Sequence, residues 1–409
     1  MKIYLVGGAV RDQLLGLKVK DRDYVVVGAT PEQMLALGYK PVGKDFPVFL
    51  HPQTHEEYAL ARTERKTAKG YHGFQFNTDK TVTLEDDLSR RDLTVNAMAQ
   101  DLQSQQIIDP FNGQHDIKER QLRHVSKAFT EDPVRVLRIA RFAARYANLG
   151  FVVHPQTNTL MQEMVADGEI DALVPERVWQ ELSAALNENT PSAFVKVLRA
   201  CHALKILFPE FDKLFGIPQT KKWHPEIDTG IHCMMAMDKA ADLNNDIAFA
   251  VFTHDLGKGL TPKHILPSHS GHEQAGVPLV KALCERLKVP AQHKKLALTV
   301  CRWHLYSHMA YELEAQTIHK LFQNTGAYQQ AQQFDKFLQA CQADAMGRLG
   351  QEFQKYPQAN YLRKCLQATA QIDTKLLIAK GFTGKLLGFE IDQQRIELIN
   401  RVKLSSPFL

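Results

Sequence analysis

The sequence lacks the features that define several protein classes. It has no run of about eighteen apolar residues, so we expect no transmembrane helix. Its first residues reach Gly7-Gly8 too early for the apolar core of a signal peptide. The six cysteines are scattered and form no C-x-x-C pair. This pattern excludes a disulfide scaffold and is typical of reduced thiols in a cytoplasmic protein.

The composition is that of an ordinary globular protein. Hydrophobic residues make up 44% and charged residues 23% of the 409 residues, which excludes disorder as the main state. A chain of this length is expected to form about two to four domains. The net charge is +5, and eight basic residues face only three acidic ones between Lys118 and Arg145. This local excess is compatible with a polyanionic partner.

The hydrophobic patterns predict a mixed N-terminal region followed by helices. We expect strands at 2–6, 23–27, 57–61, 82–84 and 106–109, a short helix at 10–17 and a mobile polar loop at 63–80. From Asp132-Pro133 onward the pattern is helical, because an aspartate before a proline is a strong helix start. The expected helices are 176–188, 193–204, 246–254, 275–287, 292–304 and 329–348.

A glycine pair and two aspartates indicate phosphate chemistry near the N-terminus. Gly7-Gly8 offers backbone N–H groups to phosphate oxygens at the start of a helix, and Arg11 lies one turn further on. Asp21 and Asp23 stand two residues apart before a β run, so both can face the same divalent ions. A lone D-x-D is usually a solvated turn and a lone glycine pair usually only a turn. Their combination favours phosphate chemistry.

Four segments resemble the bacterial-type (class II) nucleotidyltransferases that build the CCA end of tRNA, within the polymerase-β-like superfamily. The segments are LVGGAVRD at 5–12, DRD at 21–23, LSRRDLTVNAMA at 88–99 and EDPVRVLRIAR at 131–141. The resemblance implies an α+β fold with a polymerase-β-like head and a small sheet. It places the head at 1–140, a mostly α-helical neck and body at 141–220, an HD domain at 221–350 and a helical tail at 351–409.

The resemblance also implies roles for individual residues. Asp21 and Asp23 would hold Mg²⁺, and two such ions activate a hydroxyl and stabilise leaving pyrophosphate. Glu57 is a candidate third carboxylate, although an exposed strand glutamate would look the same. The residues implied to bind the nucleotide are Gly8, Arg11, Arg91, Asp132, Arg135, Arg138 and Arg141.

Asp132 and Arg135 have the chemistry to select the base. An aspartate accepts a hydrogen bond from the exocyclic amine that C and A share, and an arginine donates to ring or carbonyl acceptors. U and G would leave buried groups unpaired, at a cost of about 1–3 kcal/mol each. The alternative is that Asp132 only caps its helix and that Arg135 lies on the surface.

Histidines are concentrated in the second half of the chain. Ten of the seventeen lie between His224 and His319, and a His254-Asp255 pair follows the apolar run at 247–252. At a helix end, both side chains of such a pair can reach one ion, and imidazole suits nickel, zinc, iron and manganese. This region resembles HD-type phosphohydrolase domains. The ligands that the resemblance implies are His232, His254, Asp255, His272, His304 and Asp344.

Together these patterns predict a bifunctional enzyme. The head would add C, C and A to the tRNA acceptor end from CTP and ATP, and the HD site would use a transition metal such as Ni²⁺ to hydrolyse 2′,3′-cyclic, 2′- or 3′-phosphates. Lys258, near the His-Asp pair, is either a phosphate ligand or a solvated lysine. A poly(A) polymerase, or a tRNA-binding protein with an inactive HD fold, are the alternatives. We expect no membrane contact, a cytoplasmic location and a monomer or homodimer.

Overall fold

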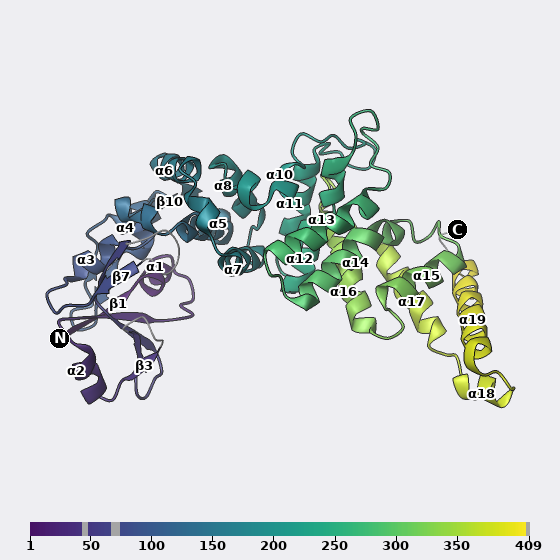
Figure 1. Ribbon diagram of the computed structural model, residues 1–409, viewed down its shortest axis with the longest axis horizontal. Helices are drawn as coiled ribbons and strands as arrows, with labels where there is room; N and C mark the ends of the chain where they lie inside the picture. The colour runs from purple at the N-terminus through teal and green to yellow at the C-terminus, as the bar shows by residue number, and fades with distance from the viewer. Residues whose placement is uncertain (43–47, 67–73, 406–409) are drawn as a thin grey trace. The chain divides into compact units, whose positions relative to one another are not determined.

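The computed structural model describes residues 1–42, 48–66 and 74–405. The chain divides into two compact units, shown in Figure 1. The first comprises Met1–Ala185 with Ala193–Leu207, and the second comprises Leu186–Ser192 with Phe208–Leu409. The domain limits expected at 140, 220 and 350 follow sequence motifs and stay predictions.

A seven-stranded mixed sheet forms the base of the first unit. Its order is β3-β4-β5-β2-β1-β8-β9, and all its described neighbours are antiparallel except β2 and β5. The strands are β1 (Lys2–Val6), β2 (Asp23–Val27), β3 (Lys40–Val42), β4 (Val48–Leu50), β5 (Glu57–Leu60), β8 (Ala99–Asp101) and β9 (Ile107–Ile108). Branched residues dominate β1 and β2, and Val6 and Val25 pack into the core beside Leu88.

Two expectations for residues 63–84 were wrong. Instead of a loop, β6 (Thr63–Lys66) and β7 (Phe74–Asn77) pair as a separate antiparallel sheet, while 67–73 lie outside the described residues. Instead of a strand at 82–84, Thr83 begins α3 (Leu84–Ser89) by accepting a hydrogen bond from the Asp86 N–H. Thr83 and Asp86 cap each other reciprocally, and this local cap replaces strand pairing.

Short helices connect and follow the strands of the first unit. They are α1 (Gly8–Leu14), α2 (Pro31–Ala36), α4 (Gly113–Lys118), α5 (Val134–Tyr146), α6 (Pro155–Ala166), α7 (Pro175–Leu186), α8 (Ser192–Ala200) and α9 (Leu204–Leu207). A two-stranded parallel pair, β10 (Gln121–Leu122) with β11 (Val152–Val153), lies beside α5. Gly7 precedes α1 with φ +69, and a Cβ there would meet the Arg91 guanidinium at 2.9 Å. Only glycine suits this turn, which brings the backbone close to Arg91.

The second unit is helical. Its helices are α10 (Pro209–Asp212), α11 (Thr229–Lys239), α12 (Asn245–Thr253), α13 (His272–Arg286), α14 (Ala291–His308), α15 (Ala315–Thr325), α16 (Ala331–Met346), α17 (Pro357–Thr369), α18 (Thr374–Ala379) and α19 (Gly384–Leu404). Helix α12 is buried from Asp246 to Thr253 and packs against α11, α14 and α16. It is therefore the central helix, as its apolar sequence requires.

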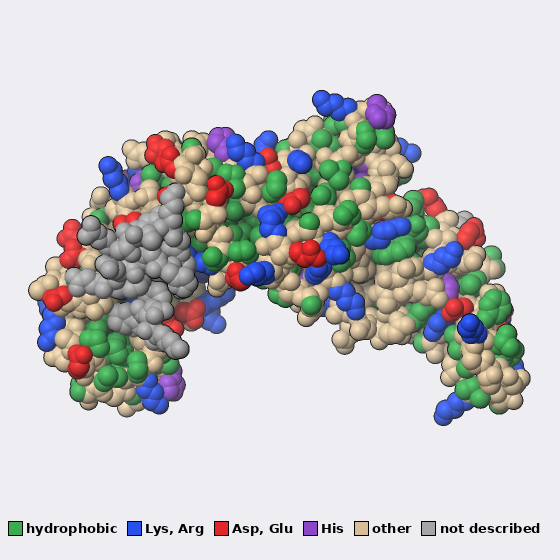
Figure 2. All heavy atoms as spheres, in the orientation of Figure 1, with side chains coloured by type: hydrophobic (Ala, Val, Ile, Leu, Met, Phe, Trp, Pro, Cys, Tyr) green, Lys and Arg blue, Asp and Glu red, His purple; other side chains and the backbone are tan. Residues whose placement is uncertain are grey.

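The helices expected from sequence are all present, with ends that differ by a few residues. All six cysteines are buried free thiols. Apolar side chains reach the surface on α18 and α19, as Figure 2 shows in green; they include Leu376, Ile378, Leu386 and Phe389. Among the described residues, no helix combines the length and apolarity needed to cross a bilayer.

Candidate active sites

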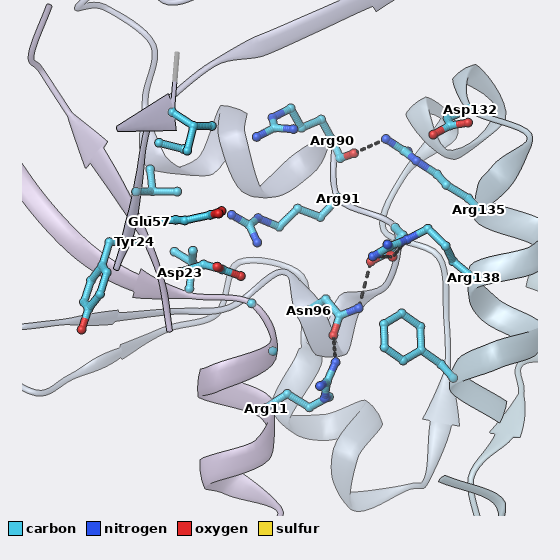
Figure 3. A pocket seen from close by; sticks show the side chains of 18 of the residues that line it. Arg11, Asp23, Tyr24, Glu57, Arg90, Arg91, Asn96, Asp132, Arg135 and Arg138 are labelled. Carbon is cyan, nitrogen blue, oxygen red and sulfur yellow. Dashed lines mark hydrogen bonds and ion pairs between the residues drawn. The ribbon is translucent and has the colours of Figure 1, made fainter. Parts of the chain in front are cut away.

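The first candidate site is a cavity of about 560 Å³ in the first unit. Its wall contains nine of the ten head residues expected from sequence: Gly8, Arg11, Asp23, Glu57, Arg91, Asp132, Arg135, Arg138 and Arg141. Asp21 lies outside the wall, two residues before Asp23. Figure 3 shows the carboxylates of Asp23 and Glu57 on one side and Asp132, Arg135 and Arg138 on the other. The fold thus gathers motifs that are far apart in sequence.

The acidic side of this cavity is built by the parallel strands β2 and β5. Asp23 and Glu57 are register partners on these strands, so their side chains face the same way. Burial raises the pKa of Asp23 above its usual range, Asp21 adds to the rise, and Arg91 opposes it. Asp23 and Glu57, with Asp21 two residues before Asp23, offer the oxygen ligands that Mg²⁺ prefers.

Two buried aspartates position the arginines of the cavity. Asp87 accepts from Arg90 at 2.7 Å and from Arg91 at 3.1 Å. Asp92 accepts from Arg138 Nε at 2.8 Å. Burial alone would raise the pKa of each carboxyl, but the neighbouring guanidinium groups lower it below the usual range. Both aspartates stay ionised and hold the arginines in place.

Other arginines are held in the same way by partners that sequence reasoning missed. Arg11 donates to Asp12 at 2.8 Å and to Asn96, whose amide in turn donates to Asp92 at 2.9 Å. Arg141 donates to Glu181 at 2.6 Å. Asp92 and Asn96 lie inside the motif at 88–99, whereas Glu181 lies outside all four motifs.

Asp132 and Arg135 both have partners within the protein. Asp132 Oδ1 accepts from the Val134 N–H at 3.1 Å, and its two oxygens accept from Arg177 at 3.2 and 3.0 Å. Arg135 is only 7% exposed and donates to the carbonyls of Ala128 and Arg90, at 2.8 and 2.6 Å. The N-cap of α5 is Pro133, and Asp132, one residue earlier, contributes at this helix start only by accepting from the Val134 N–H. The alternative of a surface Arg135 was wrong. Arg177, on α7, was not anticipated.

The second candidate site lies inside the second unit, where four helices and one helix end meet. Helix α11 supplies His232, and the His254-Asp255 pair stands at the end of α12. His272 is the first residue of α13, while α14 supplies His304 and α16 supplies Asp344. All six ligands expected from sequence are buried here: His232, His254, Asp255, His272, His304 and Asp344. The close approach of Gly257 to the His272 carbonyl, which leaves no room for a Cβ, brings α13 up to the pair.

Each histidine of this cluster presents Nε2 to a common centre. The Nδ1 atoms of His254, His272 and His304 lie 2.7, 2.7 and 3.1 Å from backbone carbonyls. The Nδ1 atom of His232 lies 3.1 Å from Glu226 Oε1. A proton on Nδ1 leaves the Nε2 lone pair free for a metal.

The atoms that face the centre are close to one another, and His232 Nε2 lies within hydrogen-bonding distance of Asp344 Oδ1, at 3.0 Å. Nε2 of His254 lies 3.2 Å from Asp255 Oδ2, and Nε2 of His272 lies 3.2 Å from Asp255 Oδ1. His254 Nε2 and Asp255 Oδ1 are buried, yet neither makes a well-formed hydrogen bond to a described residue. Imidazole nitrogens and carboxylate oxygens that converge in this way fit the ligand preferences of a metal ion of the first transition series.

The electrostatics of the cluster are dominated by its carboxylates. Burial disfavours a charged imidazole, but Asp255 and Asp344 raise the pKa of His254 to about 9. Despite burial, the nearby cations hold the pKa of Asp255 and of Asp344 well below the usual range. Both carboxylates are therefore available as anionic ligands.

Three further residues support this cluster. Glu226 orients His232, and His308 Nε2 lies 2.7 Å from Asp344 Oδ2. Lys258 is buried and donates to Asp255 and to Gln219, at 2.6 Å in each case. The reading of Lys258 as a solvated lysine was wrong. His308 belongs to the histidine-rich stretch, and its position one helical turn after His304 was the signal that could have found it.

Comparison with known proteins agrees with this architecture. A family model for the poly A polymerase head domain matches residues 3–123, one for a probable RNA- and SrmB-binding site of polymerase A matches 150–215, and one for the HD domain matches 229–335. The fold is accordingly a polymerase head followed by a helical body and an HD domain.

Full-length relatives and solved structures extend this agreement. The multifunctional CCA protein of Thioalkalivibrio sulfidiphilus is 57% identical, over 98% of this chain and 99% of its own. That of Alkalilimnicola ehrlichii is 54% identical, over 100% and 99%. A CCA-adding enzyme structure (apo form II) shares the fold with a TM-score of 0.64, 23% identity and coverage of 99% and 92%. The Thermotoga maritima CCA-adding enzyme complexed with tRNA shares the fold with a TM-score of 0.62 and 22% identity, and the match covers 99% of this chain and 91% of that one. The chain therefore belongs to the family of multifunctional CCA proteins.

Proposed function

We propose that this protein adds C, C and A to the 3′ end of tRNA, using CTP and ATP and no nucleic-acid template. The observation that carries the proposal is the cavity in which Asp23 and Glu57 face a wall of positioned arginines. Carboxylates suit the metal ions of nucleotidyl transfer, and arginines suit a triphosphate. The names of the full-length relatives support the same activity.

In this proposal each side of the head cavity has its own task. Asp21, Asp23 and Glu57 hold Mg²⁺, which when bound supplies activation of the attacking hydroxyl and charge neutralisation for the leaving pyrophosphate. Arg11 and Arg91 bind the phosphates and orient the nucleotide beside the Gly7-Gly8 turn. Arg138 and Arg141 complete the pocket, each fixed by a carboxylate.

Base selection falls to Asp132 and Arg135. Each carboxylate oxygen has two lone pairs, so Asp132 can bind Arg177 and still accept from the amine of C or A. Arg177 thereby fixes the direction in which Asp132 presents its remaining lone pairs. Arg135 lines the same side of the cavity, and two backbone carbonyls fix the position of its guanidinium.

We propose that the HD site hydrolyses phosphates at damaged RNA ends: 2′,3′-cyclic, 2′- or 3′-phosphates. His232, His254, Asp255, His272, His304 and Asp344 are the residues that would hold the metal, for which Ni²⁺ is our choice. A divalent metal, when bound, lowers the pKa of a coordinated water. Removing an end phosphate would expose the 3′-hydroxyl that the head extends, which links the two sites in tRNA repair in the cytoplasm.

One incubation separates the head's candidate activities. tRNA lacking CCA is mixed with labelled CTP or ATP and Mg²⁺, and the products are sized. Addition that ends after C, C and A supports the proposal. Open-ended addition of A would favour a poly(A) polymerase, the alternative whose name the head-domain family carries. No addition would favour a tRNA-binding protein without catalysis.

A second experiment tests whether the two sites act independently. We expect Asp255→Ala to abolish hydrolysis of 2′,3′-cyclic AMP across a series of divalent metals while CCA addition survives. Asp21→Ala should do the reverse, because the two residues belong to different compact units. Loss of both activities in a folded Asp255→Ala protein would contradict the two-site proposal.

A further inference from the structure

We propose that the cavity beside the HD cluster is a nucleotide-binding site, in which Arg348 binds the phosphate and Trp223 stacks on the base. This inference rests on the proposed hydrolase function and adds how the substrate is recognised. It identifies the substrates as phosphates attached to a nucleoside, in preference to small phosphate esters of any kind.

The cavity has the size and charge for such a ligand. Its volume is about 600 Å³, within the usual range of about 300–1,000 Å³ for small-molecule sites. His272, one of the expected metal ligands, forms part of its wall, so the cavity reaches the metal cluster. Its wall carries three cationic side chains, Lys258, Arg348 and Lys355, against one carboxylate, Glu312. The charge favours an anion.

Arg348 is the cation best able to bind that anion. Lys258 is already bound to Asp255 and Gln219. The nearest carboxylate oxygen to Arg348, on Asp344, lies 3.9 Å away, beyond hydrogen-bonding distance. Its Nε is buried and has no hydrogen-bond partner among the described residues. The Arg348 side chain lines the cavity, and no described carboxylate oxygen lies within hydrogen-bonding distance of its guanidinium, which is therefore placed to make charge-assisted hydrogen bonds to a phosphate.

Trp223 supplies an aromatic surface in the wall of the same cavity. The residue is 56% exposed, which is high for an indole, and Lys222 Nζ lies 4.6 Å from the ring centre. Bases of any sequence stack on exposed aromatic rings because every base has a π-face. The apolar neighbours Leu305 and Met309 also line this cavity and suit a base better than a phosphate.

Glu226 ties the base and phosphate elements to the metal cluster. Its Oε1 atom lies 3.0 Å from His224 Nδ1 and 3.1 Å from His232 Nδ1. Its Oε2 atom accepts from the N–H of Leu349, the residue after Arg348, at 3.3 Å. The Glu226 carboxylate thus contacts three parts of the site: His224 beside Trp223, the expected metal ligand His232, and the turn that carries Arg348. This arrangement holds a base and its phosphate at a fixed distance from the cluster.

The same nucleotide chemistry can come from a free nucleoside phosphate or from the last nucleotide of an RNA chain. The experiment therefore uses both sources with the full-length, Ni²⁺-loaded protein. Free substrates are adenosine 2′-monophosphate and, as a monoester without a base, glycerol 2-phosphate. The RNA substrate is an oligonucleotide that ends in a 2′,3′-cyclic phosphate, compared with free 2′,3′-cyclic AMP.

We expect Trp223→Ala to raise KM about 5- to 150-fold for the nucleotides and to leave glycerol 2-phosphate unchanged. Trp223→Phe should restore most of the binding. Arg348→Gln should raise KM for all substrates, and Arg348→Lys should recover only part of it, because lysine cannot form the bidentate contact. Trp303→Ala and Arg363→Gln, whose side chains lie outside the cavity wall, serve as matched controls.

The outcomes separate this inference from the proposed function. Wild-type hydrolysis with unchanged KM values in the Trp223 and Arg348 variants would overturn the inference and leave the function standing. If the wild type hydrolyses nothing, titration of adenosine 2′-monophosphate followed by indole fluorescence decides: quenching lost in Trp223→Phe supports the site, and no quenching overturns it. If Trp223→Ala raises KM for only the free nucleotides or only the RNA oligonucleotide, the site is supported and the affected substrate is identified as the one that it binds.

Discussion

Asp23 and Glu57 lie directly opposite each other on the parallel strands β2 and β5. Their carboxylates therefore belong to one side of the head cavity, although they stand 34 positions apart in the sequence. Parallel pairing sets this relationship, because register partners on parallel strands face the same way. Glu57 is accordingly a stronger candidate for a third Mg²⁺ ligand than its exposed position on the strand alone suggests.

We predict that Glu57→Gln slows CCA addition about 10- to 100-fold and raises the Mg²⁺ concentration needed for half-maximal rate. The amide keeps the shape of the side chain but loses the charge that holds a cation. Glu56→Gln is the matched control, since Glu56 lies outside the cavity wall. A magnesium titration of initial rates gives the answer, and wild-type rates for Glu57→Gln throughout would exclude a role for this carboxylate.

Base choice should depend on Asp132 and on its partner Arg177. We predict that Asp132→Ala lowers the preference for CTP over UTP about 5- to 150-fold, because the acceptor for the base amine is lost. Arg177→Met should lower it as well, because Asp132 is then no longer oriented, without disturbing the hydrogen bond that the Val134 N–H donates to Asp132. Single-nucleotide incorporation of CTP, UTP and ATP measures the ratio.

Asp132→Asn is the control for helix capping. Asparagine is as good a cap as aspartate, whereas alanine costs about 0.5–2 kcal/mol of stability. If Asp132 only capped the helix, Asp132→Ala would lower the melting temperature, Asp132→Asn would not, and all nucleotide ratios would match the wild type. That pattern would remove Asp132 from base selection.

The buried ion pair between Asp92 and Arg138 should show in the pH dependence of stability. Arg138 holds the pKa of the Asp92 carboxyl below its usual value near 4. A group whose pKa is lowered by folding stabilises the folded state above its unfolded pKa, and this contribution disappears as pH falls through the folded value. We therefore predict that wild type exceeds Asp92→Asn in free energy of unfolding by a constant amount from pH 7 to pH 5.

Below about pH 4 the two free energies of unfolding should converge. Urea unfolding of both proteins between pH 3 and pH 7 tests this, with Asp167→Asn, at an exposed helix end, as the control. We expect a difference of about 1–3 kcal/mol at neutral pH, typical of a buried charged hydrogen bond. A difference that grew towards low pH would show that the Asp92 carboxyl is not stabilised in its ionised form.

Gly257 should be essential for the HD site because of close packing. A Cβ at this position would lie 2.0 Å from the His272 carbonyl oxygen, so Gly257→Ala must push α13 away from the His254-Asp255 pair. We predict loss of about 1–3 kcal/mol of stability and weaker Ni²⁺ binding by calorimetry, with CCA addition retained. Gly388→Ala, on α19 with open space around it, should instead be neutral or stabilising. Normal Ni²⁺ affinity in Gly257→Ala would contradict the packing argument.

The sequence predicted what local patterns determine. The glycine turn, Asp23 and the six expected HD ligands could be proposed from short motifs. The structure places the glycine turn and Asp23 in the wall of the head cavity and buries the six expected ligands in the second unit. The sequence could not reveal Asp92 as the partner of Arg138, 46 positions away, because such ion pairs depend on the tertiary fold. The sequence of β6 and β7 did not indicate strands because the stretch at 63–80 is polar and rich in Lys and Gly, a composition typical of loops. The prediction of a strand at 82–84 was wrong because Thr83 and Asp86 cap each other reciprocally and so start a helix there.

The buried cysteines give the molecule its own reporters of local opening. Burial raises the pKa of Cys201 and Cys284 to about 11 and that of Cys301 to about 12, so in the closed protein these thiols are neither exposed nor ionised. A thiol reagent can modify them only when the surrounding structure opens. Cys201 belongs to the first unit, and the other five cysteines belong to the second. Labelling rates followed by peptide mass spectrometry would therefore read the opening free energies of the two units separately, in one unmodified protein.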